Sequence, residues 1–440
     1  MPGLLRDRFR WILIAWMFVI SATAYLDRVN ISIAGQVLQK ELHLSNTELG
    51  WIFSAFVLGY ALSQAPGGRL ADRYGPRRTI FFATLWWGVF TALTAAFSAL
   101  AAVISVRFLL GVGEAVVYPA SNRLVGNWIP TRERGKANGW IFAGVGAGAG
   151  IAPPLITYIV LHYGWRTSFW VSAVLGIIVG AIWYLVCRDH PDEHPLVSAR
   201  EALEIREGLT NRSTKALPWS SIFSSRDVLL LTLSYFSYGY SAYIFFTWFF
   251  IYLSRVRGLD LKASSYYAML PFLAMAVGSP FGGWLSDRIA LRFGKRAGRC
   301  GMAIAGLALC AVFIACGTYA SDARVASIIL AGGAGALYLS QSSFWSVTAD
   351  VAGEGAGSVS GVMNMGNQLG GALTASLTPY LAAQFGWSAS FLVAAVLCLI
   401  AAILWFGIDP ERRIEHRVSA GLAPSLLPPS VPGLPQSTHD

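Results

Sequence analysis

The stretch GRLADRYGPRR, residues 68–78, is a charged turn between two apolar runs, residues 47–66 and 79–98. A run of about 20 apolar residues is long enough to cross a bilayer as a helix. Basic loops resist translocation, so the turn predicts a helical hairpin whose loop stays in the cytoplasm. A similar turn, DRIALRFGKR, follows a later apolar run at residues 287–296. The hairpin is therefore expected twice.

The rest of the chain continues this pattern. Of its 440 residues 55% are hydrophobic and only 13% are charged, against about 25% charged residues in an ordinary soluble domain. A water-soluble globule is excluded on this composition. Twelve membrane-spanning helices are predicted near residues 11–35, 47–66, 79–98, 100–122, 137–160, 167–187, 227–253, 265–285, 299–318, 324–348, 357–383 and 388–408. The predicted class is an all-α membrane protein.

The basic residues indicate the orientation of these helices. The N-terminus, the even-numbered loops and the tail hold 25 of the 33 Lys and Arg residues, and the odd-numbered loops hold six. By the positive-inside rule both termini are cytoplasmic. The net charge of +10 is thereby explained by topology and not by nucleic-acid binding. The predicted external loops hold no Asn-x-Ser/Thr acceptor, which favours a bacterial inner membrane over a eukaryotic surface.

Polar stretches divide the chain into four parts. We expect an N-terminal six-helix bundle at residues 1–188, a cytoplasmic linker at 189–226, a C-terminal six-helix bundle at 227–408 and a disordered cytoplasmic tail at 409–440. Within the linker, Ser198 and Glu201 have capping-box spacing and predict a short charged helix.

The two predicted bundles also repeat one another. GWRTSF at residues 164–169 returns as GWSASF at 386–391, an offset of 222 residues that also relates Gly139 to Gly361. Six spans in each bundle give both repeats the same orientation. Parallel repeats are typical of transporters with two bundles and a substrate site between them.

Four charged residues lie well inside the predicted spans: Asp27, Arg28, Arg107 and Glu114. Intramembrane charges are costly and usually functional. Arg107 and Glu114 are seven residues apart and share a helix face, whereas the adjacent Asp27 and Arg28 diverge by about 100°. The four charges sum to zero, so an entering anion needs compensation, which protonation of a carboxylate supplies. The alternative is a purely structural network of ion pairs.

Polar side chains inside the spans are candidates for contact with a polar ligand. They are Tyr25, Tyr60, Tyr235, Tyr238, Gln341, Ser342, Trp345, Asn364, Asn367 and Gln368. The alternative for each of these side chains is a hydrogen bond between helices that plays no part in ligand binding. Asn364 and Asn367 are alternatives for the same ligand-contacting position in the span at residues 357–383.

Other motifs argue against an enzyme. Gly144, Gly146, Gly148 and Gly150 lie inside an apolar helix without a preceding strand, so they predict close helix packing and not a nucleotide loop. The five cysteines form no CxxC pair, and neither a P-loop nor a nucleophile arrangement is present in the sequence. We expect no catalytic residue, no cofactor and no metal.

The chain resembles the major facilitator superfamily, and within it the anion:cation symporters that include bacterial sugar-acid:proton symporters and, more distantly, sialin and vesicular glutamate transporters. The resemblance covers about residues 10–410. Its motifs are GRLADRYGPRR at 68–78, YLDRVN at 25–30, RFLLGVGEA at 107–115, WIP at 128–130 and ERGKA at 133–137.

The resemblance implies roles for the intramembrane charges. Arg28 is expected to bind the substrate carboxylate, and Glu114 to couple protonation to substrate contact. Asp27 is expected to be a second proton site near Arg107. Similar symporters also place an aromatic or amide side chain at the positions of Tyr60, Trp345 and Asn364, and Tyr25 joins this expected substrate site.

The resemblance further implies that the turn at residues 68–78 is a cytoplasmic gate, in which Gly68, Asp72, Arg73 and Arg77 take part. A glycine permits close backbone approach, and a carboxylate at Asp72 can face a helix N-terminus. The alternative is a solvated basic turn that serves only to set topology.

The expected function is secondary active transport. The chain is expected to import a small organic anion, a sugar acid of the galactonate, glucarate or hexuronate type, with protons by alternating access in the major facilitator fold. The alternative within this fold is a potential- or exchange-driven facilitator or exporter, and a channel, receptor or membrane-embedded enzyme ranks below both. The expected partners are the organic acid, protons and the lipid bilayer, and the chain is expected to be a monomer.

Overall fold

The computed structural model describes residues 8–209 and 217–414, and every regular element within them is a helix. The first set of long helices is α2 (Phe9–Glu41), α3 (Asn46–Tyr74), α4 (Pro76–Ala96), α5 (Leu100–Glu114), α6 (Val117–Trp128), α7 (Arg134–Tyr163) and α8 (Trp165–Val186). The second set is α11 (Arg226–Thr247), α13 (Leu261–Phe293), α14 (Lys295–Tyr319), α15 (Ala323–Ala352), α16 (Ala356–Phe385) and α17 (Trp387–Leu404). The expected disordered tail lies mostly outside the described residues, which end at residue 414.

Shorter elements join the long helices. They are η1 (Thr131–Glu133), η2 (Pro191–Glu193), α9 (Ala199–Gly208), α10 (Trp219–Ser224), α12 (Phe249–Ile251), the π-helical segment η3 (Tyr252–Val256), η4 (Gly353–Gly355) and η5 (Trp405–Gly407).

Among the described residues, ten helical segments are long and apolar enough to cross a membrane. The two remaining predicted spans, 47–66 and 357–383, lie on α3 and α16, which are 29 and 30 residues long. These two helices pack against each other and bury polar side chains such as Gln64 and Asn364. Their polar contacts with each other explain why they are less apolar than helices that face lipid along most of their surface.

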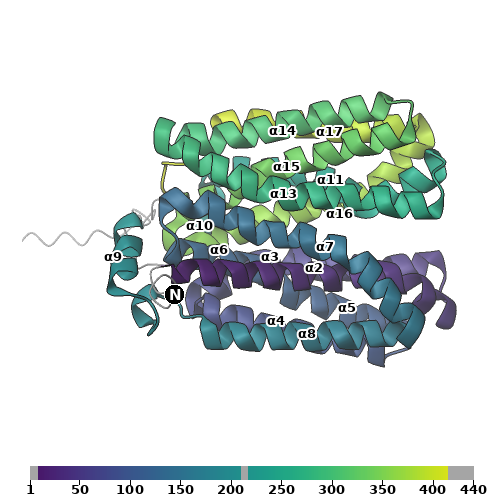
Figure 1. Cartoon of the computed structure of the whole chain (residues 1–440), viewed down its shortest axis with the longest axis horizontal. Helices are drawn as coiled ribbons and strands as arrows, with labels where there is room; N and C mark the ends of the chain where they lie inside the picture. The colour runs from purple at the N-terminus through teal and green to yellow at the C-terminus, as the bar shows by residue number, and fades with distance from the viewer. Residues whose placement is uncertain (1–7, 210–216, 415–440) are drawn as a thin grey trace, which may run out of the picture.

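Figure 1 shows α2 to α8 on one side of the molecule and α11 to α17 on the other. We call residues 9–186 the N-terminal half and residues 226–408 the C-terminal half. The two halves meet where α3 packs on α16 and α7 packs on α13. The first described residues and the linker helix α9 lie at the same end of the helices (Figure 1).

Three of the four α7 glycines pack as the sequence predicted, whereas Gly150 has no close backbone neighbour. A Cβ on Gly144 or Gly148 would overlap the backbone of α2, and one on Gly146 would overlap the backbone of α13. Small residues on two sides of one helix permit backbone contact with both neighbours. Thus α7 links the core of the N-terminal half to the C-terminal half.

The fourth predicted span, 100–122, is interrupted. Helix α5 ends at Glu114 and α6 begins at Val117. Pro119 has no N–H to donate to the carbonyl of Ala115, which explains the break. The break places Glu114 at a helix end in the protein interior, where its side chain is 1% exposed.

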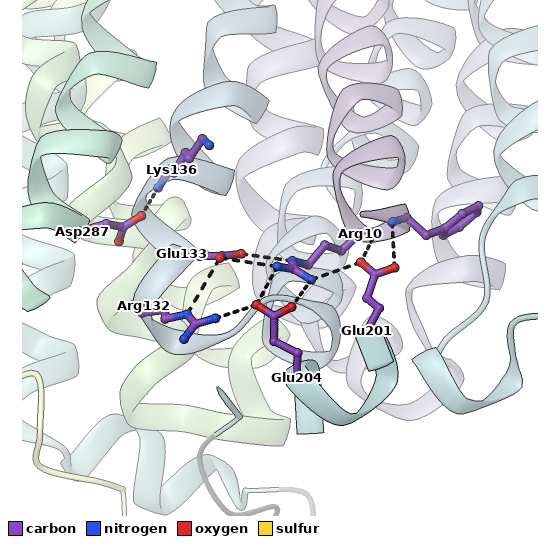
Figure 2. A network of polar contacts seen from close by, with 8 residues as sticks. Arg10, Arg132, Glu133, Lys136, Glu201, Glu204 and Asp287 are labelled. Carbon is purple, nitrogen blue, oxygen red and sulfur yellow. Dashed lines mark hydrogen bonds and ion pairs between the residues drawn. The ribbon is translucent and has the colours of Figure 1, made fainter. Parts of the chain in front are cut away.

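The linker helix α9 docks on the start of α2 (Figure 2). The Glu201 carboxylate accepts the backbone N–H groups of Phe9 at 2.8 Å and Arg10 at 3.1 Å. An anion is favoured there because the first N–H groups of a helix lack intrahelical partners. The Arg10 guanidinium also pairs with Glu133 and Glu204, at 3.1 Å each. The contacts of Glu201 and Glu204 thereby fix the linker to the N-terminal half, and Glu133, which belongs to that half, holds Arg10 in place.

The predicted cap of α9 is correct in one of its two contacts. The Ser198 side chain accepts the backbone N–H of Glu201, as the spacing indicated. The carboxylate of Glu201 reaches α2 instead of serving only its own helix. A tertiary contact therefore uses the side chain that the local motif assigned to the cap.

His194 holds the segment before α9. Its ring lies 4.0 Å from the ring of Phe9, its Nε2 contacts the carbonyl of Val186 at 2.8 Å, and its Nδ1 accepts the backbone N–H of Leu196 at 3.2 Å. These contacts fit the tautomer with the proton on Nε2. Burial lowers the pKa of His194, although the hydrogen bond to Val186 opposes the shift.

We predict that acidification loosens this linker. A lowered pKa in the folded state means that the stabilisation from neutral His194 is present above about pH 6.5, the ordinary histidine pKa, and is lost as the pH falls through the folded-state value. Protonation of Nδ1 would also remove the acceptor for Leu196. Hydrogen-exchange protection of residues 190–205, corrected for intrinsic exchange, should fall between about pH 7.5 and about pH 5.

The control is His194→Gln, which does not titrate and should show protection that is independent of pH over this range. Equal protection of the wild-type linker at both pH values would contradict the prediction.

Candidate functional site

A polar cavity lies between the two halves, where α2, α3, α6 and α7 face α11, α15 and α16. It is lined by Tyr25, Tyr60, Tyr118, Phe142, Tyr235, Tyr238, Ala242, Tyr243, Phe246, Tyr338, Gln341, Trp345, Asn364, Asn367 and Gln368. Five predicted substrate-site residues, Tyr25, Tyr60, Trp345, Asn364 and Asn367, are among them. The structure thus brings together side chains that the sequence separates by more than 300 positions.

The cavity is small in this conformation. It offers about 30 Å³ of room for the centres of water-sized spheres, and a single water needs about 10–15 Å³ on this measure. The cavity is therefore too small in this conformation for the expected organic acid.

Tyr235 organises the wall that the C-terminal half contributes. Its hydroxyl oxygen accepts hydrogen bonds from Gln341 Nε2 at 2.9 Å and Trp345 Nε1 at 3.0 Å, which leaves the hydroxyl proton free to be donated. The hydroxyl of Tyr238 and the amide oxygen of Gln341 are buried without a hydrogen-bond partner in the described part of the chain. The wall therefore presents donors and an acceptor to a polar ligand.

Amides extend this wall to the N-terminal half. Asn364 donates to Gln64 Oε1 at 2.9 Å, and Asn367 donates to Asn364 Oδ1 at 3.4 Å. Both asparagines line the cavity, so the structure keeps both as candidates. Ser342 is buried but does not line the cavity.

Arg28 and Glu114 form an ion pair behind the cavity wall. The guanidinium nitrogen Nη2 lies 2.7 Å from Glu114 Oε1, with the two side chains 13% and 1% exposed. The guanidinium also lies over the rings of Tyr25 and Tyr60, at 4.6 and 4.5 Å from their centroids. Two cavity-lining tyrosines therefore stand directly against the pair.

Arg107 has a different environment. Within the described residues it has no carboxylate at ion-pair distance, and its guanidinium lies 4.8 Å from the centre of the Phe56 ring. Arg28 approaches the same ring at 5.2 Å. Two helical turns separate Arg107 from Glu114, about 10 Å along the axis, so the shared face predicted from sequence does not produce a direct pair. Glu114 binds Arg28 across the helices instead.

Asp27 faces α4 and not the cavity. Its Oδ2 accepts hydrogen bonds from Trp87 Nε1 at 3.0 Å and Thr91 Oγ1 at 2.6 Å. Asp27 is 1% exposed and is absent from the cavity lining. The predicted divergence of Asp27 and Arg28 around the helix is confirmed, since one contacts α4 and the other contacts α5.

Asp72 joins α3 to the start of α16 in the other half. Its carboxylate accepts the backbone N–H groups of Gly357 at 3.0 Å and Ser358 at 2.7 Å, and Ser358 adds its hydroxyl. Gly68 lies so close to Gly357 that a Cβ on either glycine would overlap the backbone of the other. Gly68 and Asp72 thus make one contact between the halves.

Asp287 makes the equivalent contact with α7. Its carboxylate accepts the backbone N–H group of Gly135 at 2.9 Å and that of Lys136 at 2.5 Å, the second of which is drawn in Figure 2. Gly135 and Gly357 are 222 residues apart, the offset found in the sequence repeat. Each half therefore supplies a carboxylate to the start of a helix in the other half.

Buried arginines add ion pairs on the Asp287 side. Arg134 Nη1 lies 2.5 Å from Asp350 Oδ1, and Arg299 Nη1 lies 2.5 Å from Asp287 Oδ1. Arg299 also donates to the carbonyl of Thr131 at 2.9 Å. The pair of Arg134 with Asp350 and the bond to Thr131 both cross between the halves.

The other two expected gate residues stay within the N-terminal half. The Arg73 side chain is exposed and lies over the ring of Tyr74. Arg77 lies 4.2 Å from the centre of the Tyr184 ring and donates to the carbonyl of that residue. The structure does not bring either residue to the contact between the halves.

Several site residues were missed by sequence reasoning. They are the cavity residues Tyr118, Phe142, Ala242, Tyr243, Phe246 and Tyr338, and the supporting residues Phe56, Gln64, Trp87 and Thr91. A signal existed for some of them, because Tyr338, Gln341 and Trp345 follow the i, i+3, i+7 spacing of one helix face. Partners such as Trp87 carried no comparable signal.

Comparison with known proteins places these observations in context. A family model described as Major Facilitator Superfamily matches residues 17–375 and 361–432. The probable sulfoacetate transporter SauU of Cupriavidus necator is 35% identical over 93% of this chain and 96% of its own. The hexuronate transporter of Bacillus subtilis is 30% identical over 89% of this chain and 92% of its own.

A solved structure has a similar fold. That of the proton:xylose symporter XylE bound to 6-bromo-6-deoxy-D-glucose gives a TM-score of 0.73, covering 93% of this chain and 98% of that one. The sequences are 14% identical, so this likeness concerns the fold alone.

Proposed function

The chain belongs to the Major Facilitator Superfamily and is a membrane transporter of organic anions and not an enzyme, and we propose that it imports a sugar acid together with protons by alternating access. The observation that carries the proposal is the buried pair of Arg28 and Glu114, 2.7 Å apart beside a polar cavity between the two halves. Galactonate, glucarate and hexuronate are the proposed types of substrate.

The ion pair suggests how substrate and proton are coupled. A substrate carboxylate that reaches Arg28 competes with Glu114 for the same guanidinium. Displaced Glu114 would be a buried charge without its partner, which is strongly unfavourable. Protonation of Glu114 removes this cost. One substrate carboxylate would therefore enter with a proton on Glu114.

Asp27 is proposed as a second proton site near Arg107. Its hydrogen bonds to Trp87 and Thr91 stabilise the carboxylate away from the substrate cavity. The charges of Asp27 and Glu114 both act on Arg107, so protonation of either carboxylate would change the field at this arginine. This arrangement would let the second proton bind without direct contact with the substrate.

The contacts of Asp72 and Asp287 are proposed as the cytoplasmic gate. They hold helix starts of one half against the last turns of α3 and α13 in the other half, and release of both would open that side. This proposal includes twelve spans in two six-helix bundles, divided as 1–188 and 227–408, with the linker, the tail and both termini cytoplasmic. The chain is proposed to act as a monomer in the cell inner membrane.

A short organosulfonate is a second candidate substrate. The observation in its favour is the 35% identity to a probable sulfoacetate transporter over 93% of this chain. A thermal-shift screen with galactonate, glucarate, glucuronate and sulfoacetate separates the two classes. A ligand at 100 times its dissociation constant adds about 2.7 kcal/mol to the stability of the protein. Stabilisation by sulfoacetate alone would refute the sugar-acid proposal.

The first prediction concerns Arg28. Arg28→Lys keeps the positive charge but loses the planar donor geometry that binds a carboxylate through two hydrogen bonds. Because a charged hydrogen bond is worth about 1.5–3 kcal/mol, substrate affinity measured by calorimetry should fall at least about tenfold. The melting temperature of the variant provides the folding control. Undiminished affinity would rule out the assignment of Arg28 as the carboxylate-binding residue.

The second prediction concerns the gate. Asp72→Asn replaces a carboxylate that accepts two backbone N–H groups with a weaker neutral acceptor. The population should move toward conformations open to the cytoplasm, measured as a longer spectroscopic distance between labels at the ends of α3 and α16. Arg73→Gln is the matched control, because Arg73 does not contact the other half. If the two variants have the same distance distribution, Asp72 does not hold the gate.

The third prediction concerns coupling. Glu114→Gln imitates the protonated acid in shape but cannot release a proton. In proteoliposomes the variant should lose accumulation driven by an imposed pH gradient while it retains substrate counterflow. Normal proton-driven accumulation would show that Glu114 is not the coupling carboxylate and would move the assignment to Asp27. Accumulation that is independent of the pH gradient in the wild type would favour a facilitator or exchanger.

A further inference from the structure

A second cavity, separate from the site between the halves, lies at the start of α11. It has a volume of about 330 Å³ and opens between α10, the first residues of α11 and the segment that follows α17. Its lining comprises Ser221, Ser224, Ser225, Arg226, Asp227, Arg412, Arg413 and Ile414. The backbone N–H of Ile414 donates a hydrogen bond to the carbonyl of Val351, near the end of α15. The cavity therefore lies at the end of the molecule where α15 approaches the proposed gate contacts.

The cavity carries a net positive charge. Three arginines face one aspartate, and Asp227 is already engaged, since it accepts the backbone N–H of Asp409 at 3.0 Å and lies 3.5 Å from Arg412. Within the described ranges, Arg226 and Arg413 have no ion-pair partner. Asp227 therefore anchors the segment after α17 and leaves two guanidinium groups available for an anion.

Polar groups around the arginines suit a phosphate. The Ser221 side chain is buried, with the residue 4% exposed, and its hydroxyl has no hydrogen-bond partner in the described residues. The 22-residue helix α11 starts at Arg226, which lines the cavity. The positive end of the helix dipole therefore lies at the cavity. Hydroxyl donors, guanidinium groups and a helix start are the groups that bind phosphate oxygens.

Apolar surface begins directly beside the cavity. Leu229 and Leu233 are exposed one and two turns into α11, and Ile403 and Phe406 are exposed at the end of α17 and in η5. The apolar surface of α17 and η5 adjoins that of α11 and the cavity, because α11 packs against α17 and a Cβ on Gly407 would lie 3.5 Å from Arg226 Nη2. A ligand held by the arginines would thus have an apolar surface next to its phosphate.

We propose that this cavity binds the headgroup of an anionic phospholipid, with the phosphodiester at Arg226 and Arg413 and the acyl chains along the exposed leucines of α11. A free phosphate shares the headgroup chemistry, but it makes no use of the adjoining apolar surface. It would also meet exposed guanidinium groups whose attraction is screened by salt. A lipid in the same leaflet is held beside the site by the bilayer. Basic pockets on the cytoplasmic side are known to take such headgroups.

The test uses the full chain purified in detergent and titrated with phosphatidylglycerol, with binding read from thermal shift and from native mass spectrometry. Each arginine near an anionic lipid surface contributes about 1 kcal/mol, which converts to about fivefold in affinity. The double variant Arg226→Gln/Arg413→Gln should therefore weaken phosphatidylglycerol binding about 25-fold. The matched control Arg78→Gln/Arg200→Gln removes two exposed arginines outside the cavity and should bind like the wild type.

Two further arms identify the ligand. Phosphatidylcholine has no net charge and should bind weakly to all variants, and inorganic phosphate should neither stabilise the chain nor displace phosphatidylglycerol. Arg226→Lys/Arg413→Lys should keep most of the affinity, which separates loss of charge from loss of fold. Equal affinity in the cavity variant and the control would overturn the proposal. Displacement of phosphatidylglycerol by inorganic phosphate would overturn it in favour of a free-anion site.

Discussion

Backbone N–H groups at the start of α7 and α16 need acceptors at the seam between the two halves, and each half supplies one to the other. Asp72 binds Gly357 and Ser358, and Asp287 binds Gly135 and Lys136. An unpaired N–H in a poorly hydrated interior costs several kcal/mol, so the two carboxylates fix which helix ends meet. Glycines at the same places let the backbones approach within contact distance. We propose that these contacts hold the cavity in its closed form.

The proposed transport site likewise depends on polar groups that have few partners available. Arg28 and Glu114 pair with one another where both side chains are largely shielded from water. Such a pair is stable only while both partners are present, so a competing anion changes the preferred protonation of the carboxylate. The proposed gate and the proposed site are therefore both built from polar groups with few possible partners. This scarcity is what makes exchange of partners an effective switch between conformations.

The end of the molecule that carries the seam contacts also carries the linker and the basic cavity. Residues 131–136 contact Arg10 of the N-terminal half and Glu204 of the linker on one side and Asp287 of the C-terminal half on the other (Figure 2). Thr131 also accepts a hydrogen bond from Arg299 of the C-terminal half. The loop thus connects the docked linker to the proposed gate. Lipid binding at the start of α11 would act on the same end of the C-terminal half.

The sequence by itself determined the class of the protein, because the composition and length of each apolar run decide whether that segment is stable as a helix across the bilayer. It also located the intramembrane charges, the close packing of glycines in α7 and nine of the fifteen residues that line the cavity. Only the tertiary structure decided the partners. Glu114 pairs with Arg28 and not with Arg107 on its own helix, Glu201 reaches α2, and Asp27 turns to Trp87. Spacing along one helix fixes which face a side chain occupies. Which helix lies opposite that face depends on how all the helices pack together.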